Sequence, residues 1–125
     1  QYKLGNGQKA IELLEEAIDI YDQIGEQQHK AIALESLGEA FDSIGDYVHS
    51  KERYEQSLEI ACTKGYLYEE ALARWQLSLL VYRYGNRSEA ISQAEIALGI
   101  FQRLENPQAF RVNEELTRWK SEAPT

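Results

Sequence analysis

The sequence predicts an all-α protein in which antiparallel helix pairs stack as a solenoid and a C-terminal helix caps the stack. Three observations support this prediction: glycines recur with a period of 40 residues, apolar side chains follow helical spacing, and turn residues stand between the helical segments. No segment shows the pattern of a strand that would compete with these helices. The helix pair is therefore the unit from which we expect the fold to be built.

The period of 40 residues is visible in several independent columns. Gly5, Gly45 and Gly85 are each followed by Asn or Asp. Small and aliphatic residues recur at the same shift: Ala10, Ser50 and Ala90; Ala17, Ser57 and Ala97; Ile18, Leu58 and Leu98; Ile20, Ile60 and Ile100. Gly25 and Gly65 also correspond, whereas Glu105 breaks that series. Agreement in so many columns indicates a tandem repeat.

Each unit is predicted to hold a helix A and a helix B, with glycine at the helix ends. A first helix over 8–24 follows the turn "GNG" at 5–7 and ends at Gly25. The next, 28–44, carries apolar residues at 34, 37, 41 and 44 and ends at Gly45, where we expect a left-handed stop.

The remaining helices follow from capping residues. Asp46 is a good N-cap for 48–64, which ends at Gly65. Asn86 with Glu89 forms a capping-box pattern for 87–104, which follows the helix 67–84. The last helix, 108–121, has Glu114, Thr117 and Arg118 where the repeat has a large residue, Leu and Gly, so we interpret it as a cap.

We expect residues 1–125 to form a single domain that is a piece of a longer protein. Its predicted parts are a partial first repeat with only its helix B (5–27), a second repeat (28–66), a third repeat (67–106), a capping helix (107–121) and a tail (122–125). The cap should bury one apolar face with Phe110, Val112, Leu116 and Trp119. It should present Arg111, Arg118 and Lys120 to water.

The charge balance is acidic, with a net charge of -8. This is the opposite of the basic surface expected of a nucleic-acid-binding protein, so no nucleic acid partner is expected. One cysteine, Cys62, cannot form an internal disulfide, and there is no signal-peptide pattern or apolar run near the ~18 residues of a membrane span. We therefore expect a cytoplasmic protein without a membrane partner.

The helix pair of the second unit resembles the tetratricopeptide repeat. The residues that carry the resemblance are Leu34, Leu37, Gly38, Phe41, Ser50, Tyr54 and Ser57. The resemblance implies a right-handed superhelix in which helix B crosses helix A closely at Gly38. The third unit departs from the motif, with Arg74, Ser78, Val81 and Ala94 in place of the large residue, the glycine and the two aromatic residues.

The repeat is also longer than the common form of ~34 residues. In this respect it is similar to the long repeats of Pins and LGN-type scaffolds, kinesin light chains and bacterial signal-transduction ATPases and regulators. The resemblance implies that the array holds a partner and performs no chemistry. We thus expect no enzyme activity.

In such a solenoid the A helices line a concave surface that is the usual binding face. The predicted groove residues are Glu35, Glu39 and Asp42 on one helix, and Trp75, Leu79, Tyr82 and Arg83 on the next. An acidic stripe beside an aromatic stripe would suit a protein or peptide with basic and large apolar residues. Two simpler interpretations stay open: the acidic stripe is a solvated helix face, and the aromatic stripe is covered by the C-terminal helix.

The first unit lacks most of its helix A, because only "QYKL" precedes the turn. Part of Ile11, Leu14, Ile18 and Tyr21 should therefore be exposed, and we expect self-association through this end.

No arrangement of residues predicts a catalytic, cofactor or metal site. His29 and His49 have no metal ligand at suitable spacing, and Cys62 has no partner that would activate it. Two functions remain. The favoured one is a protein-protein interaction module that binds a peptide or partner domain in its groove. The alternative is a regulatory array that packs on and restrains a catalytic or ATPase domain of the same protein.

Overall fold

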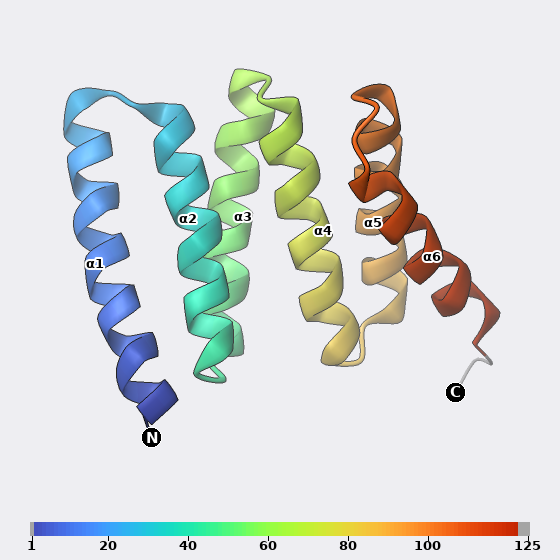
Figure 1. The fold of residues 1–125 in the computed structure, drawn as a ribbon, viewed down its shortest axis with the longest axis horizontal. Coiled ribbons are helices and arrows are strands. Elements are labelled where there is room, and N and C mark those ends of the chain that lie inside the picture. Colours follow the sequence, from blue (N-terminus) through green and yellow to red (C-terminus); the bar gives the residue numbers. More distant parts are fainter. Residues whose placement is uncertain (1, 123–125) are drawn as a thin grey trace.

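The computed structural model describes residues 2–122, and their side chains from residue 6 onward. This part of the chain consists of six helices that run alternately up and down (Figure 1). Their bounds are α1 Tyr2–Ile24, α2 Gln27–Ser43, α3 Tyr47–Lys64, α4 Leu67–Arg83, α5 Arg87–Arg103 and α6 Gln108–Ser121. The described residues contain no strand, so the predicted all-α stack of helix pairs is confirmed.

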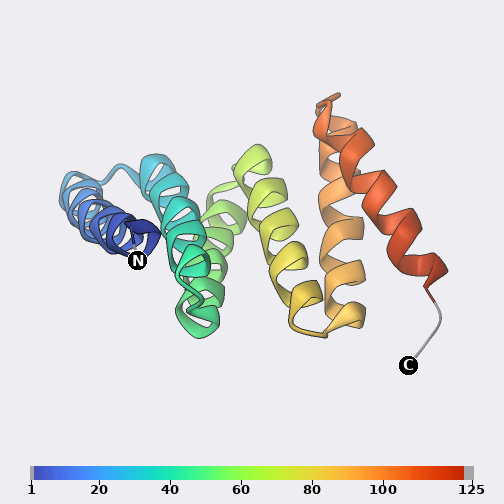
Figure 2. The ribbon, with the colours of Figure 1, turned by 60° about the horizontal axis from the view of Figure 1, so that its bottom comes forward.

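Successive helices pack against one another, and the helix pairs form two layers. The pairs are α2 with α3 and α4 with α5, and α2 also touches α4 directly. In Figure 1, α3 lies partly behind α2, and α5 lies beside α4 and behind α6. Figure 2 shows the same staggered succession from another side, with α6 inclined across the end of the stack. The layer of α2 and α4 corresponds to the A helices of the repeat.

The turns have the conformation that the glycines predicted. Gly25, Gly45, Gly65 and Gly85 all have positive φ, between 75° and 94°. Glu105 takes the same left-handed conformation with a φ of 52°, although this region favours glycine. The side chains of the two predicted N-caps also act as expected, because Asp46 accepts from the His49 amide and Asn86 from the Glu89 amide, each at 3.1 Å.

The start of the first helix differs from the prediction. The structure has one helix from Tyr2 through the segment "GNG", where we predicted a turn and a start at residue 8. A glycine in a helix costs only about 1 kcal/mol relative to alanine and does not forbid the helical conformation, so the backbone continues through Gly5. Gly7 is needed for another reason: a Cβ there would lie 2.5 Å from Cγ2 of Ile44, the residue that follows α2.

The close crossing of helices A and B at Gly38 is confirmed. A Cβ at Gly38 would lie 2.6 Å from the ring of Tyr54, which is buried on α3. Two small residues of α3 also bind the backbone of α2: Ser50 Oγ donates to the Gly38 carbonyl and Ser57 Oγ to the Ala31 carbonyl, each at 2.7 Å. The small residues at these columns of the repeat thus allow α3 to approach α2 closely, and the buried serine hydroxyl groups are hydrogen-bonded.

The third unit keeps this packing with the sizes exchanged. Ser78 stands where the second unit has Gly38, and Ala94 stands where it has Tyr54; both are fully buried. By its column, a larger residue of helix A thus stands opposite a smaller one of helix B, an exchange of sizes that conserves volume and that packed cores tolerate.

The C-terminal helix packs one apolar face on the third unit, as predicted. It buries Val112, Leu116 and Trp119 against the third unit. Arg111, Arg118 and Lys120 are exposed. The prediction for Phe110 was wrong, because its side chain is 72% exposed. Arg87 of α5 holds the end of α6, with Nε donating to the Trp119 carbonyl at 2.8 Å and Nη2 to the Glu122 carbonyl at 3.0 Å.

Candidate partner-binding face

The predicted groove lies on the face formed by α2 and α4. The structure divides its seven residues into two groups that sequence reasoning had placed on one surface. Trp75, Leu79 and Tyr82 belong to the core cluster under α6 or pack against it. Glu35, Glu39, Asp42 and Arg83 lie on the α2 and α4 face.

The aromatic stripe is covered by α6, so the prediction that Trp75 is open to a partner was wrong. Trp75 is 3% exposed, and its ring centroid lies 6.1 Å from that of Trp119. Tyr82 stacks on Trp119 at 4.5 Å and donates its hydroxyl proton to Glu122 Oε1 at 2.6 Å, a bond that raises the pKa of Tyr82. The physical reason is that the apolar face of α6 needs an apolar partner, and these rings provide it.

The acidic stripe is held by cross-links between α2 and α4. Arg83 forms an ion pair with Asp42, and Gln76 Nε2 donates to Glu39 Oε2 at 3.1 Å. At the other end of the helices, Gln28 Nε2 donates to Glu69 Oε2, also at 3.1 Å. The face is therefore less negative than its carboxylates suggest, because Arg83 neutralises one of them.

Glu35 is buried, unlike the other carboxylates of the stripe. Only 8% of the residue is exposed. The pKa of its carboxyl group is raised from 4.5 to about 7, chiefly by burial and also by the charge of Glu39, while a hydrogen bond with Gln76 acts in the opposite direction. Glu35 therefore changes its charge close to neutral pH.

A small cavity of about 120 Å³ opens beside Glu35, and we call it the Glu35 cavity. Its lining consists of Ala31, Ile32, Glu35, Ser57, Tyr68, Glu69 and Leu72. Two of these apolar residues, Ile32 and Tyr68, are more than 40% exposed at the surface. The exposed wall of this cavity is almost entirely apolar, so the cavity can hold an apolar side chain or the aliphatic stem of a basic one.

Sequence reasoning missed the apolar part of this site. Ile32 and Leu72 occupy the same column of the repeat, outside the stripe that packs helix A on helix B. The sequence did offer a signal for this part of the site, because both units have an apolar residue at a column that faces away from helix B.

The described residues contain no group of three or more His, Cys, Asp or Glu that could hold a metal ion. Each His ring lies 2.8 Å from a carboxylate at a helix start, His29 from Glu26 and His49 from Asp46. Burial raises the pKa of the Cys62 thiol, which is the opposite of what a nucleophile needs. Among these helices, none has the length and apolar character to cross a membrane.

Comparisons with known proteins give a consistent result. A family model described as tetratricopeptide repeat matches residues 1–63, which end in α3, before the unit that departs from the motif. No curated protein matches significantly.

Two solved structures of TPR-like repeats share the fold. Both are nearly identical repeats of a putative kinesin light chain from Podosopora anserina, one of them with a single substitution, with TM-scores of 0.76 and 0.77 and 22% identity. The alignments cover 92% of this chain and 58% and 57% of theirs.

Proposed function

Because the chain belongs to the tetratricopeptide repeat family, whose repeats are generally protein-interaction modules, we propose that its α2 and α4 face binds a peptide segment of a partner protein. The segment carries a Lys or Arg next to an apolar residue. The basic side chain enters the Glu35 cavity, and the apolar residue lies on Ile32 and Tyr68.

The buried carboxyl group of Glu35 supports this proposal. A carboxyl group in an apolar cavity is costly when ionised, and an incoming cation would offset that cost. Glu39 and Glu69 add negative charge on either side, while Asp42 is already paired with Arg83. The basic residue should therefore bind near Glu35 and not near Asp42.

The test uses fluorescein-labelled peptides of roughly 12 residues, a length that spans a groove of this kind. Each peptide holds one Lys or Arg next to Leu, Phe or Tyr, and a parallel set has Gln at the basic position. Fluorescence anisotropy at neutral pH should show saturable binding of the basic set alone. The double variant Glu35→Gln with Glu39→Gln should weaken it by roughly tenfold or more.

The matched control is Glu12→Gln with Glu16→Gln, which removes two exposed carboxylates from α1. This control should retain the affinity of the unchanged protein. Equal losses in both variants would mean that only net charge attracts the peptides, and the proposed site would be rejected.

We propose in addition that α1 mediates self-association. Leu13, Ile20 and Ile24 on α1 are 56–64% exposed. Leu14 and Tyr21 are half-buried, whereas the residues in the same columns of α3, Tyr54 and Ala61, are buried against α2. The expected Ile11 is not part of this surface, because it is buried against Leu37 and Phe41.

A further inference from the structure

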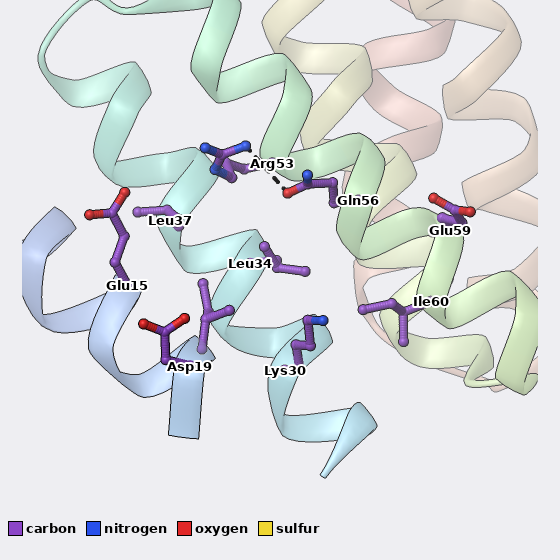
Figure 3. Close-up of a pocket in the computed structure, with 10 residues that line it drawn as sticks. Glu15, Asp19, Lys30, Leu34, Leu37, Arg53, Gln56, Glu59 and Ile60 are labelled. Atoms are coloured by element: carbon purple, nitrogen blue, oxygen red, sulfur yellow. Dashed lines mark hydrogen bonds between the residues drawn. The ribbon is translucent and has the colours of Figure 1, made fainter. Parts of the chain in front are cut away.

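A second and larger cavity lies between the B-layer helices α1 and α3, with α2 beneath it. We call it the α1–α3 cavity; its volume is about 580 Å³, within the range of ~300–1,000 Å³ usual for ligand sites. Figure 3 shows Glu15 and Asp19 on the α1 side, Glu59 and Ile60 on the α3 side, and Leu34 and Leu37 of α2 between them. The cavity thus combines an apolar floor with carboxylates on both walls.

The acidic and the basic side chains that line this cavity differ in whether they have partners. Glu15, Asp19 and Glu59 form no salt bridge with any residue among those described. The two cations in the lining do have partners. Lys30 Nζ lies 2.8 Å from Asp22 Oδ1, and Arg53 bonds Gln56 while lying over the ring of Phe41. The carboxylates that line the cavity therefore outnumber its cations and are available to bind a positively charged group.

The third unit shows which side chain can fill the corresponding space between two B helices, which we call the furrow of a unit. The column of Leu34 is occupied there by Arg74, whose side chain is half-buried between α4, α3 and α5. Its Nε donates to Glu70 and its Nη1 to Gln93, each at 2.9 Å, and its Nη2 approaches Cys62 Sγ at 3.7 Å. The furrow of the third unit is thus filled from within by a guanidinium group, whereas Leu34 is too short to fill the furrow of the second.

We propose that the α1–α3 cavity binds an arginine side chain of a partner peptide. The aliphatic part of the arginine packs on Ile18 and Ile60, which are only partly buried, and its guanidinium group bonds the carboxylates of Glu15, Asp19 and Glu59. A planar guanidinium group can bond two carboxylates at once, and its weak hydration makes burial less costly than for an ammonium group. This site lies on the opposite layer from the α2 and α4 face and is independent of the function proposed for that face.

The test is a ¹H–¹⁵N chemical-shift titration with the blocked tripeptide acetyl-Leu-Arg-Leu-amide. The control ligand has citrulline, a neutral residue of the same shape, in place of arginine. We expect saturable shifts at the amides of the cavity residues with the arginine peptide, and binding at least roughly tenfold weaker with citrulline.

Two variants locate the binding. The triple variant Glu15→Gln, Asp19→Asn and Glu59→Gln should weaken binding by at least roughly tenfold. The matched triple variant Glu12→Gln, Glu16→Gln and Glu55→Gln removes the same charge from exposed positions outside the cavity and should not. A further variant, Lys30→Glu with Leu34→Arg, transplants the pair of Glu70 and Arg74 and should abolish binding by filling the cavity from within.

Four outcomes would overturn the proposal: no saturable shift, equal binding of the citrulline peptide, equal losses in the two triple variants, or shifts confined to α2 and α4. If the transplanted pair prevents folding, the comparison of the two triple variants still tests whether the peptide binds in the α1–α3 cavity. Because they leave Glu35 and Glu39 unchanged, they should retain binding of the longer peptides on the α2 and α4 face. The two proposals can therefore fail separately.

Discussion

At the scale of single residues, burial decides what the acidic side chains of helix A can do. Glu35, Glu39 and Asp42 form one stripe in the sequence, yet one is buried, one accepts from Gln76 and one is paired with Arg83. Burial is the main cause that raises the pKa of Glu35 to about 7. The periodicity could predict the stripe, but the pairing depends on how α4 lies beside α2.

The substitution Glu35→Gln should make the protein more stable at pH 8 but not at pH 4.5. The folded state holds a proton on Glu35 up to a pKa of about 7, whereas the unfolded chain releases it near 4.5. Stability therefore falls as pH rises between these values. At ~1.4 kcal/mol per pKa unit, and allowing for partial screening by solvent, the gain at pH 8 is about 2 kcal/mol.

Urea unfolding followed by circular dichroism at both pH values measures this effect. Glu12→Gln, on the exposed face of α1, is the control and should change stability equally little at each pH. A variant with the same pH dependence as the unchanged protein would show that Glu35 titrates normally.

At the scale of the helical elements, the fold depends on complementary sizes where helix B crosses helix A. The second unit pairs Gly38 with Tyr54, and the third pairs Ser78 with Ala94. The sequence showed the departure of the third unit from its motif. The packing of helix B on helix A puts these two positions at one crossing. A change of size at one of them can therefore compensate a change at the other.

The double substitution Gly38→Ser with Tyr54→Ala should be less harmful than its two parts together. Gly38→Ser alone forces a side chain into the Tyr54 ring and should cost about 1–3 kcal/mol. Tyr54→Ala alone leaves a cavity and should cost about 3–5 kcal/mol. In the double variant the serine occupies part of that cavity, so we expect a favourable coupling of about 1 kcal/mol or more.

A double-mutant cycle measured by urea unfolding gives this coupling directly. Strictly additive effects would mean that the two positions do not share one contact. The positions Ser43 and Glu59, both exposed and apart from this crossing, provide an alanine pair that should be additive.

At the scale of the whole molecule, the two ends of the stack differ. The C-terminal end is closed by α6, which covers Trp75 and is held by Arg87. At the other end, the described chain places α2 on one side of α1 and leaves Leu13, Ile20 and Ile24 at the surface. Apolar residues at such spacing on one helix form a stripe suited to another helix.

We expect this stripe to make the protein self-associate. Sedimentation velocity should show a weight-average mass that rises with concentration, and the variant Leu13→Gln with Ile20→Gln should remain monomeric. Phe110→Gln is the matched control, because it removes an exposed apolar side chain from the opposite end. A monomer mass for the unchanged protein at every concentration would reject the prediction.

The sequence by itself determined the helices and the turns other than the one expected at 5–7, and its resemblance to the repeat motif implied the close crossing at Gly38. These features depend on local chemistry and short-range spacing: glycine at positive φ, side-chain caps at Asp46 and Asn86, and apolar residues at helical intervals. It also set the last helix apart from the repeats, since the residues of α6 depart from the repeat motif.

Only the tertiary structure decided which stripes are open to a partner. Trp75 and Glu35 occupy the same column of the repeat, yet one is covered by α6 and the other lines a cavity between α2 and α4. The α1–α3 cavity likewise exists because Leu34 and Arg74 differ in length at one column, between walls supplied by distant parts of the chain. The exposure of a side chain and its hydrogen-bond or ion-pair partners depend on contacts between helices, which the residue spacing within one helix does not specify.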